Sequence, residues 1–140
     1  MSYIKLNLNP QGLNNDDCVI RAISLLLSKN WYETHYELCS LSRFMADMPN
    51  SNRVWKEYLK NAGYSEELII NTCPRCYTVK QFCTQHPNGR YLLSTTEYTL
   101  TSKIIVTGSH VVTVIDGDYY DTWDSGDDIP LSYFYRRDLR

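Results

Sequence analysis

Cys18 is the residue of this chain best placed, by its neighbours, for covalent chemistry. It stands in "NNDDCVIRAIS", where four amide and carboxylate side chains give way to an apolar run. Short polar side chains accept hydrogen bonds from the free N–H groups at a helix start, so we expect Cys18 in a first helical turn. Backbone donors and the helix dipole there favour a thiolate, which is the nucleophilic form. The alternative is a small apolar residue that opens a buried helix.

A base for this thiol is predicted on a strand. Of the three histidines, His110 opens the apolar segment "HVVTVID", where its ring can project from a sheet edge into a cleft. The "DGD" at 116–118 predicts a tight hairpin that returns "YYDTWDSG" alongside this strand. Asp121 is then expected to face His110 and to hold its tautomer, with Asp124 as the competing candidate. Trp123 is expected either to shield this pair from water or to pack in the core.

A second set of residues has the types of a zinc site. The stretch "CPRCYTVKQFCTQH" has the spacing C-x2-C-x6-C-x2-H, formed by Cys73, Cys76, Cys83 and His86. Four such ligands leave no open position on the metal, so a zinc ion bound there would be structural. The alternative is that Cys83 serves packing while Cys73 and Cys76 edge a loop.

The elements that must position these residues change type along the chain. Apolar spacing and capping signals predict helices at 17–29, 30–48, 51–63 and 78–86, and period-two patterns predict strands at 90–95, 103–109, 110–116, 119–123 and 132–137. The apolar residues of the first helix lie nearly all round it, as in a helix buried at the centre of a domain. We therefore expect one α+β domain over residues 1–140, with a buried central helix packed on a C-terminal antiparallel sheet.

Composition narrows the partners. The net charge of -2 on 140 residues, without a block of like charge, argues against nucleic acid. No apolar stretch is long enough to span a bilayer, so we expect no membrane partner, and the N-terminus lacks the features of a signal peptide. We expect a cytoplasmic protein whose five cysteines are thiols, and a peptide or protein partner.

Several short motifs resemble cysteine peptidases. "NDDCVIRAIS" is similar to the D-G-N-C-x-x-R-A pattern of ovarian-tumour-type deubiquitinases, matching at Cys18, Arg21 and Ala22. "HVVTVIDGDYYDTWDSG" resembles the H-x-V-V-V…D-P segment of bacteriocin leader peptidases, and its "DTW" resembles the N-S-W of papain, with Asp for Asn. As a whole, the chain resembles small papain-like-fold proteins encoded by bacteriophages and their bacterial hosts.

This resemblance implies a papain-like fold and a thiol hydrolase, a cysteine peptidase or isopeptidase, that requires no cofactor. Cys18 would be the nucleophile, His110 the general base and Asp121 the residue that orients it. Papain relatives complete the oxyanion hole with a glutamine at a fixed step before the cysteine. Gln11 is the candidate for this role, but it lies one residue too far from Cys18 in the sequence, so Asn14 or Asn15 would have to substitute. The alternative functions are a catalytically silent papain-like scaffold, or a zinc-organised module, that binds a host protein.

Overall fold

The computed structural model describes residues 1–96 and 110–136. Its elements, in chain order, are β1 (Tyr3–Lys5), α1 (Cys18–Leu27), α2 (Trp31–Met45), α3 (Asn52–Asn61), β2 (Ser65–Leu68), α4 (Val79–Gln85), β3 (Arg90–Thr96), β4 (His110–Ile115), β5 (Asp118–Asp121) and β6 (Ile129–Tyr135). The four predicted helices are present, with ends within a few residues of the predicted ones. The strand predicted at 103–109 lies outside the described residues.

The described strands form one mixed sheet in the order β1-β5-β4-β3-β6-β2. Neighbours pair antiparallel except β1 and β5, which are parallel. The α+β class is confirmed, but the expectation of a purely C-terminal, antiparallel sheet is wrong at both edges. The strand β1 has only three residues and β2 reads "SEEL", so neither carries the apolar alternation that identifies a strand. Both form because an existing edge offers unpaired backbone groups.

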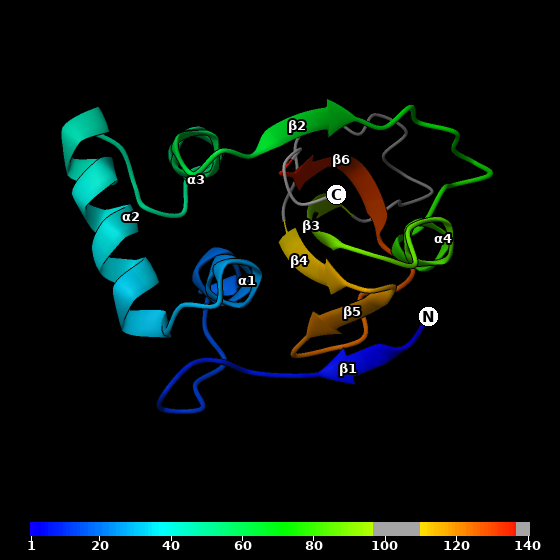
Figure 1. Cartoon of the computed structure of the whole chain (residues 1–140), viewed down its shortest axis with the longest axis horizontal. Helices are drawn as coiled ribbons and strands as arrows, with labels where there is room; N and C mark the ends of the chain where they lie inside the picture. Colours follow the sequence, from blue (N-terminus) through cyan, green and yellow to red (C-terminus); the bar gives the residue numbers. More distant parts are fainter. Residues whose placement is uncertain (97–109, 137–140) are drawn as a thin grey trace.

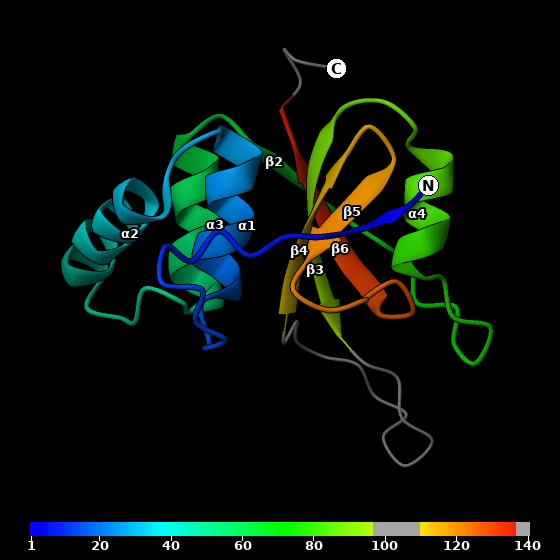
Figure 2. The same cartoon turned by 90° about the horizontal axis from the view of Figure 1, so that it is seen from below.

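Helices cover both faces of the sheet (Figures 1 and 2). α1 and α3 lie against one face with α2 outside them, and α4 lies against the other face. Successive strand side chains point to opposite faces, so Leu92 packs with the α1 and α3 side while Leu93 packs with the α4 side. Val111 and Val112 divide in the same way. The central strands are buried on both faces because the two hydrophobic layers share them.

Local signals explain where several elements start and turn. α2 and α4 each begin with a capping box, formed by Asn30 with Glu33 and by Thr78 with Gln81. The hairpin predicted at 116–118 is confirmed, since it joins β4 to β5 through residues of positive φ, Asp116 at 49° and Gly117 at 82°. This hairpin sets the register between β4, which begins with His110, and β5, which ends with Asp121.

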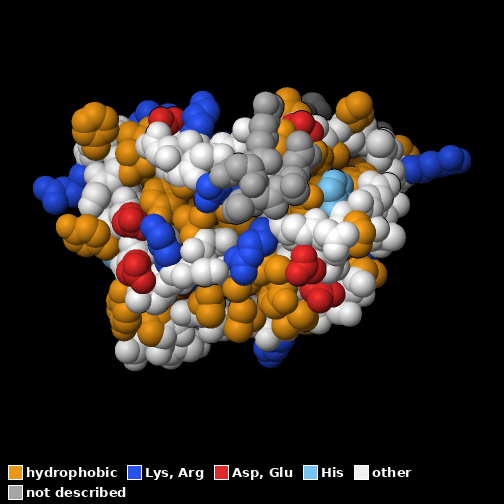
Figure 3. All heavy atoms as spheres, in the orientation of Figure 1, with side chains coloured by type: hydrophobic (Ala, Val, Ile, Leu, Met, Phe, Trp, Pro, Cys, Tyr) orange, Lys and Arg blue, Asp and Glu red, His pale blue; other side chains and the backbone are white. Residues whose placement is uncertain are grey.

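Large hydrophobic side chains remain exposed on the outer helix. They include Tyr32, Tyr36 and Phe44 of α2, and Figure 3 shows hydrophobic side chains at the edge of the molecule that α2 forms.

In the part of the chain that the structure describes, no helix combines the length and the apolar character that crossing a bilayer requires.

Candidate active site

Cys18 is the first residue of α1, as predicted, and its side chain is half-buried. It lines a cleft of about 460 Å³ that opens between α1, α3 and the end of the sheet. The other residues around this cleft are Asn14, Asn15, Asp16, Val19, Arg21, Asn50, Asn52, Trp55, His110, Val111, Thr122 and Trp123. The thiol therefore lies at a helix start and within reach of a ligand.

Asp17 occupies the N-cap position of α1, but its side chain does not cap the helix. Its carboxylate instead accepts hydrogen bonds from Asn9 Nδ2 at 2.9 Å, Trp31 Nε1 at 2.9 Å and Arg21 Nε at 2.7 Å. Burial alone would raise the pKa of Asp17, but these three donors and the Arg21 charge lower it below its usual range. The negative charge beside Cys18 is thus neutralised by its own partners.

Two side chains of the sheet hold α1 in place with three hydrogen bonds. Thr113 Oγ1, on β4, donates to the backbone oxygen of Ala22 at 2.7 Å in a fully buried position. Arg90 Nη1, on β3, donates to the backbone oxygens of Leu25 at 3.0 Å and Leu26 at 2.9 Å, in the last turn of α1. The helix that carries Cys18 is therefore anchored to the strand that begins with His110.

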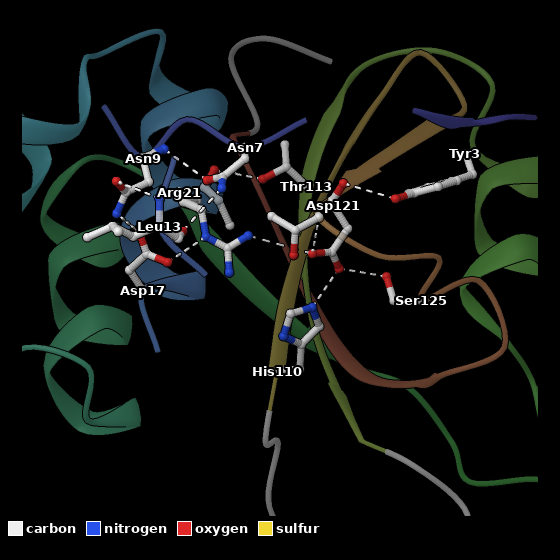
Figure 4. Close-up of polar contacts among 12 residues, drawn as sticks. Tyr3, Asn7, Asn9, Leu13, Asp17, Arg21, His110, Thr113, Asp121 and Ser125 are labelled. Carbon is white, nitrogen blue, oxygen red and sulfur yellow. Dashed lines mark hydrogen bonds and ion pairs between the residues drawn. The ribbon is translucent and has the colours of Figure 1, made fainter. Parts of the chain in front are cut away.

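The imidazole of His110 reaches Asp121 across the hairpin. The register pairs Thr113 with Tyr120, so its continuation places Asp121 opposite Val112, on the sheet face that His110 shares. His110 Nε2 donates to Asp121 Oδ2 at 2.6 Å (Figure 4). Of the two predicted candidates for this contact, the structure places Asp121 there.

Asp124 has different partners. It accepts hydrogen bonds from the hydroxyl of Tyr119 at 2.6 Å and from the backbone N–H of Gly126 at 3.0 Å. These bonds order the turn after β5, away from the His110 ring.

Asp121 is held by donors on both carboxylate oxygens, and its side chain is 2% exposed. Ser125 Oγ donates to Oδ2 at 2.7 Å, so this oxygen serves both Ser125 and His110. The Thr122 N–H donates to Oδ1 at 2.8 Å, and Arg21 Nη1 lies 3.8 Å from the same oxygen. This set of partners leaves the carboxylate little freedom to rotate away from the histidine.

The environment of His110 favours its charged form. Burial alone would lower the pKa of His110, but hydrogen bonds to Asp121 and Cys18, together with their charges, raise it to about 9. Nε2 is taken by Asp121, which leaves the other ring nitrogen available in the cleft that Cys18 also lines. Trp123 lies against the ring, with centroids 5.2 Å apart, and is 44% exposed, so it covers the histidine instead of packing in the core.

The predicted oxyanion residues separate in the structure. Asn15 lines the cleft, together with Asn14. Gln11 does not line it; its side chain is exposed and its backbone N–H donates to Asn9 Oδ1 at 2.9 Å, within the turn that precedes α1. The structure therefore does not bring Gln11 to the cleft, because its turn is organised on Asn9, which accepts the N–H groups of Gln11 and Leu13.

The four predicted zinc ligands do not converge, so this prediction is corrected. Cys73 and Cys76 are bonded to each other as a disulfide, which also corrects the expectation that all cysteines are thiols. Cys83 is buried in the layer between α4 and the sheet, where burial raises its pKa to about 11. His86 stacks on Phe82 with centroids 3.9 Å apart. Among the described residues, no group of three or more His, Cys, Asp or Glu side chains is placed to hold a metal.

Sequence reasoning missed two residues that order the site. Asn9 receives two backbone N–H groups of the turn before α1 and donates to Asp17, and nothing in the sequence around it marks this role. Ser125 supports Asp121 from a loop. Arg21 carried a usable signal, because it is the one charged residue in the apolar segment "CVIRAISLLL" and a buried charge requires partners.

The chain was compared with known proteins at three levels. No protein family model, no curated protein and no solved structure matches it. The chemistry of the site is therefore argued from its own geometry.

Proposed function

We propose that this chain is a papain-like thiol hydrolase, a cysteine peptidase or isopeptidase that cleaves a peptide-like acyl bond. One observation carries the proposal: His110, hydrogen bonded to a buried, fully satisfied Asp121, lines the same cleft as Cys18 at a helix start, and Cys18 contributes to the raised pKa of His110. A base that is oriented by a third group and contacts a nucleophile is the arrangement of covalent acyl transfer. A helix carrying the cysteine, packed on a sheet carrying the histidine and the acid, is consistent with a papain-like fold.

The reaction would proceed in two steps. The Cys18 thiolate attacks the carbonyl carbon, and the His110 imidazolium gives its proton to the leaving amine, which produces a thioester and a free amine. His110, now neutral, takes a proton from water as the water attacks the thioester. The products are a carboxylic acid, the regenerated thiolate and the imidazolium.

The developing oxyanion would be stabilised at the start of α1. The first N–H groups of a helix lack partners within the helix, and here they lie next to the attacking sulfur. The amides of Asn14 and Asn15, which line the same cleft, are the side chains that would add a donor.

Cys39 provides a matched internal control for this proposal. It is also half-buried and contacts a histidine, with its sulfur 3.5 Å from His35 Nε2. It lies in the middle of α2, and the His35 ring is stacked on Trp31, with the centroids 4.8 Å apart. Cys39 thus has a histidine neighbour without the helix start that Cys18 has.

The test uses iodoacetamide at pH 7 with peptide mapping, followed by a library of fluorogenic peptidyl aminomethylcoumarin substrates. We expect Cys18 to be alkylated at least about tenfold faster than Cys39, and Cys18→Ala to abolish hydrolysis while Cys39→Ala retains it. Equal, slow alkylation of the two cysteines would refute the hydrolase and favour a silent scaffold that binds a protein partner. Hydrolysis that persists in Cys18→Ala would equally refute it.

A further inference from the structure

Arg21 is a buried charge placed one helical turn after the nucleophile. Its side chain is 12% exposed. Its Nε donates to Asp17 Oδ1 at 2.7 Å, and its Nη1 lies 3.8 Å from Asp121 Oδ1; Figure 4 shows the guanidinium between these two carboxylates. Burying a cation is costly unless anions surround it, so this position requires both partners.

These contacts form a closed ring. Asp17 contacts Arg21, Arg21 contacts Asp121, Asp121 contacts His110, and His110 contacts Cys18, which directly follows Asp17 in the chain. With a thiolate at Cys18 and an imidazolium at His110, the charges alternate in sign from Asp17 through Arg21 and Asp121 to His110 and Cys18. Arg21, Asp121 and His110 are each flanked by charges of opposite sign, and the two negative ends of the series, Asp17 and Cys18, are neighbours in the chain.

We propose that Arg21 is a positioning residue of this site, which holds Asp121 toward His110 and, together with Asp17, sets the pH range in which the thiolate and the imidazolium coexist. This inference rests on the proposed function. Arg21 touches neither the reacting sulfur nor the histidine in the contacts described, so it acts through Asp121.

The electrostatic effect of Arg21 has a definite sign. Its positive charge beside Asp121 opposes a second positive charge on His110, while it also favours negative charge nearby, including that of the thiolate. Asp17 offsets both effects because it pairs directly with Arg21. Removing Arg21 and removing Asp17 should therefore change the site in opposite directions.

Other titratable groups approach this ring from each neighbouring element. Asp16 lines the cleft and is exposed, so solvent screens it. From β1, Tyr3 donates its hydroxyl to the backbone oxygen of Asp121, and Lys5 is the exposed register partner of Asp121. From α2, His35 stacks on Trp31, which donates to Asp17. From α3 and the turn before it, the cleft is lined by the uncharged Asn52, Trp55 and Asn50.

The test measures the rate of Cys18 alkylation by iodoacetamide from pH 4 to 10, read by mass spectrometry, in the full-length chain. In Arg21→Gln, both the acid limb and the alkaline limb of the profile should move to higher pH by about half a unit to one unit. In Asp17→Asn, both limbs should move to lower pH. Arg21→Lys keeps the charge, so its limbs should stay within about 0.2 units of the wild-type profile.

Arg53→Gln is the matched control, since Arg53 forms an exposed ion pair with Asp47 and its loss should leave the profile unchanged. Far-UV circular dichroism establishes whether each variant is folded. If Arg21→Gln does not fold, the pH profile of Cys18 alkylation in Asp17→Asn tests the proposal instead. Folded variants with an unchanged profile would overturn the positioning role and leave the proposed hydrolase standing. A wild-type protein whose Cys18 reacts no faster than Cys39 would overturn both.

Discussion

Two sets of cysteine and histidine residues in this chain have opposite outcomes. Cys73, Cys76, Cys83 and His86 are close in sequence and have a ligand-like spacing, yet they separate into a disulfide, a buried thiol and a stacked ring. Cys18 and His110 are far apart in sequence, yet the fold brings them into contact and adds Asp121.

The difference shows that the surroundings of a residue matter more here than its spacing. At α4 the apolar face of a short helix directs Cys83 into the core, and the stacking of His86 on Phe82 fixes that ring against the same helix. At the other site, buried hydrogen bonds from the sheet hold the helix, and a hairpin of defined register holds the acid. Four predictions test this contrast, from the largest expected effect to the smallest.

Asp121→Ala should cause the largest loss, because it removes both the orientation of His110 and the charge that favours the imidazolium. We expect the rate of substrate hydrolysis to fall by about 100-fold or more. Asp121→Asn still orients the ring and should lose only about tenfold, with the alkaline limb of the pH profile moving below pH 9, since the pKa of His110, now about 9, falls when the carboxylate is lost.

Asp124→Ala is the control for this pair of variants. It should retain hydrolysis but lower the free energy of unfolding, because Tyr119 and Gly126 lose their acceptor. If Asp124→Ala lost hydrolysis while Asp121→Ala kept it, the carboxylate that orients His110 would have been assigned incorrectly.

The unfolding free energy should depend on pH through the ion pair of His110 with Asp121. The pKa of His110 is raised from 6.5 to about 9 in the folded chain, so its stabilisation is complete below pH 6.5 and is lost as the pH rises through 9. This rise corresponds to roughly 3 kcal/mol. Urea unfolding at pH 6 and pH 10 should show that His110→Gln loses most of this dependence; a His110→Gln protein that keeps the full dependence would contradict the proposed ion pair.

Thr113→Val should have a smaller effect on stability. It leaves the buried oxygen of Ala22 without its side-chain donor, which should lower the unfolding free energy by about 1 to 2 kcal/mol in urea unfolding. The alkylation rate of Cys18 should also fall, because α1 loses a hydrogen bond to the strand that begins with His110.

Thr84→Val, on the exposed face of α4, is the control. It removes a comparable hydrogen bond and should change the unfolding free energy by less than about 0.5 kcal/mol. Equal effects of the two changes would argue against a special role for the buried bond.

Zinc should have the smallest effect. Because Cys73 and Cys76 are bonded to each other, adding zinc chloride should change the melting temperature by less than about 1 °C. A rise of several degrees that disappears in Cys83→Ala would restore the metal site.

The sequence by itself determined the local features of this protein. The polar run before an apolar segment predicted a helix start at Cys18, even though Asp17 does not cap the helix, and the "DGD" turn placed two strands side by side, because helix starts and tight turns depend on neighbouring residues. The α+β order followed from the change of hydrophobic period along the chain. The identity of Asp121 as the His110 partner was predicted from strand register, with Asp124 left as an alternative.

Only the tertiary structure decided which distant groups meet. The edge strands β1 and β2 form because neighbouring strands offer unpaired backbone groups. The residues of β1 and β2 do not themselves have the pattern that predicts a strand. The separation of Gln11 from the cleft depends on a turn organised by Asn9. The Arg21 contacts join residues from α1 and β5, so they exist only when the helix packs on the sheet. A buried charge in the sequence indicates that partners are required, but the packing of the elements chooses them.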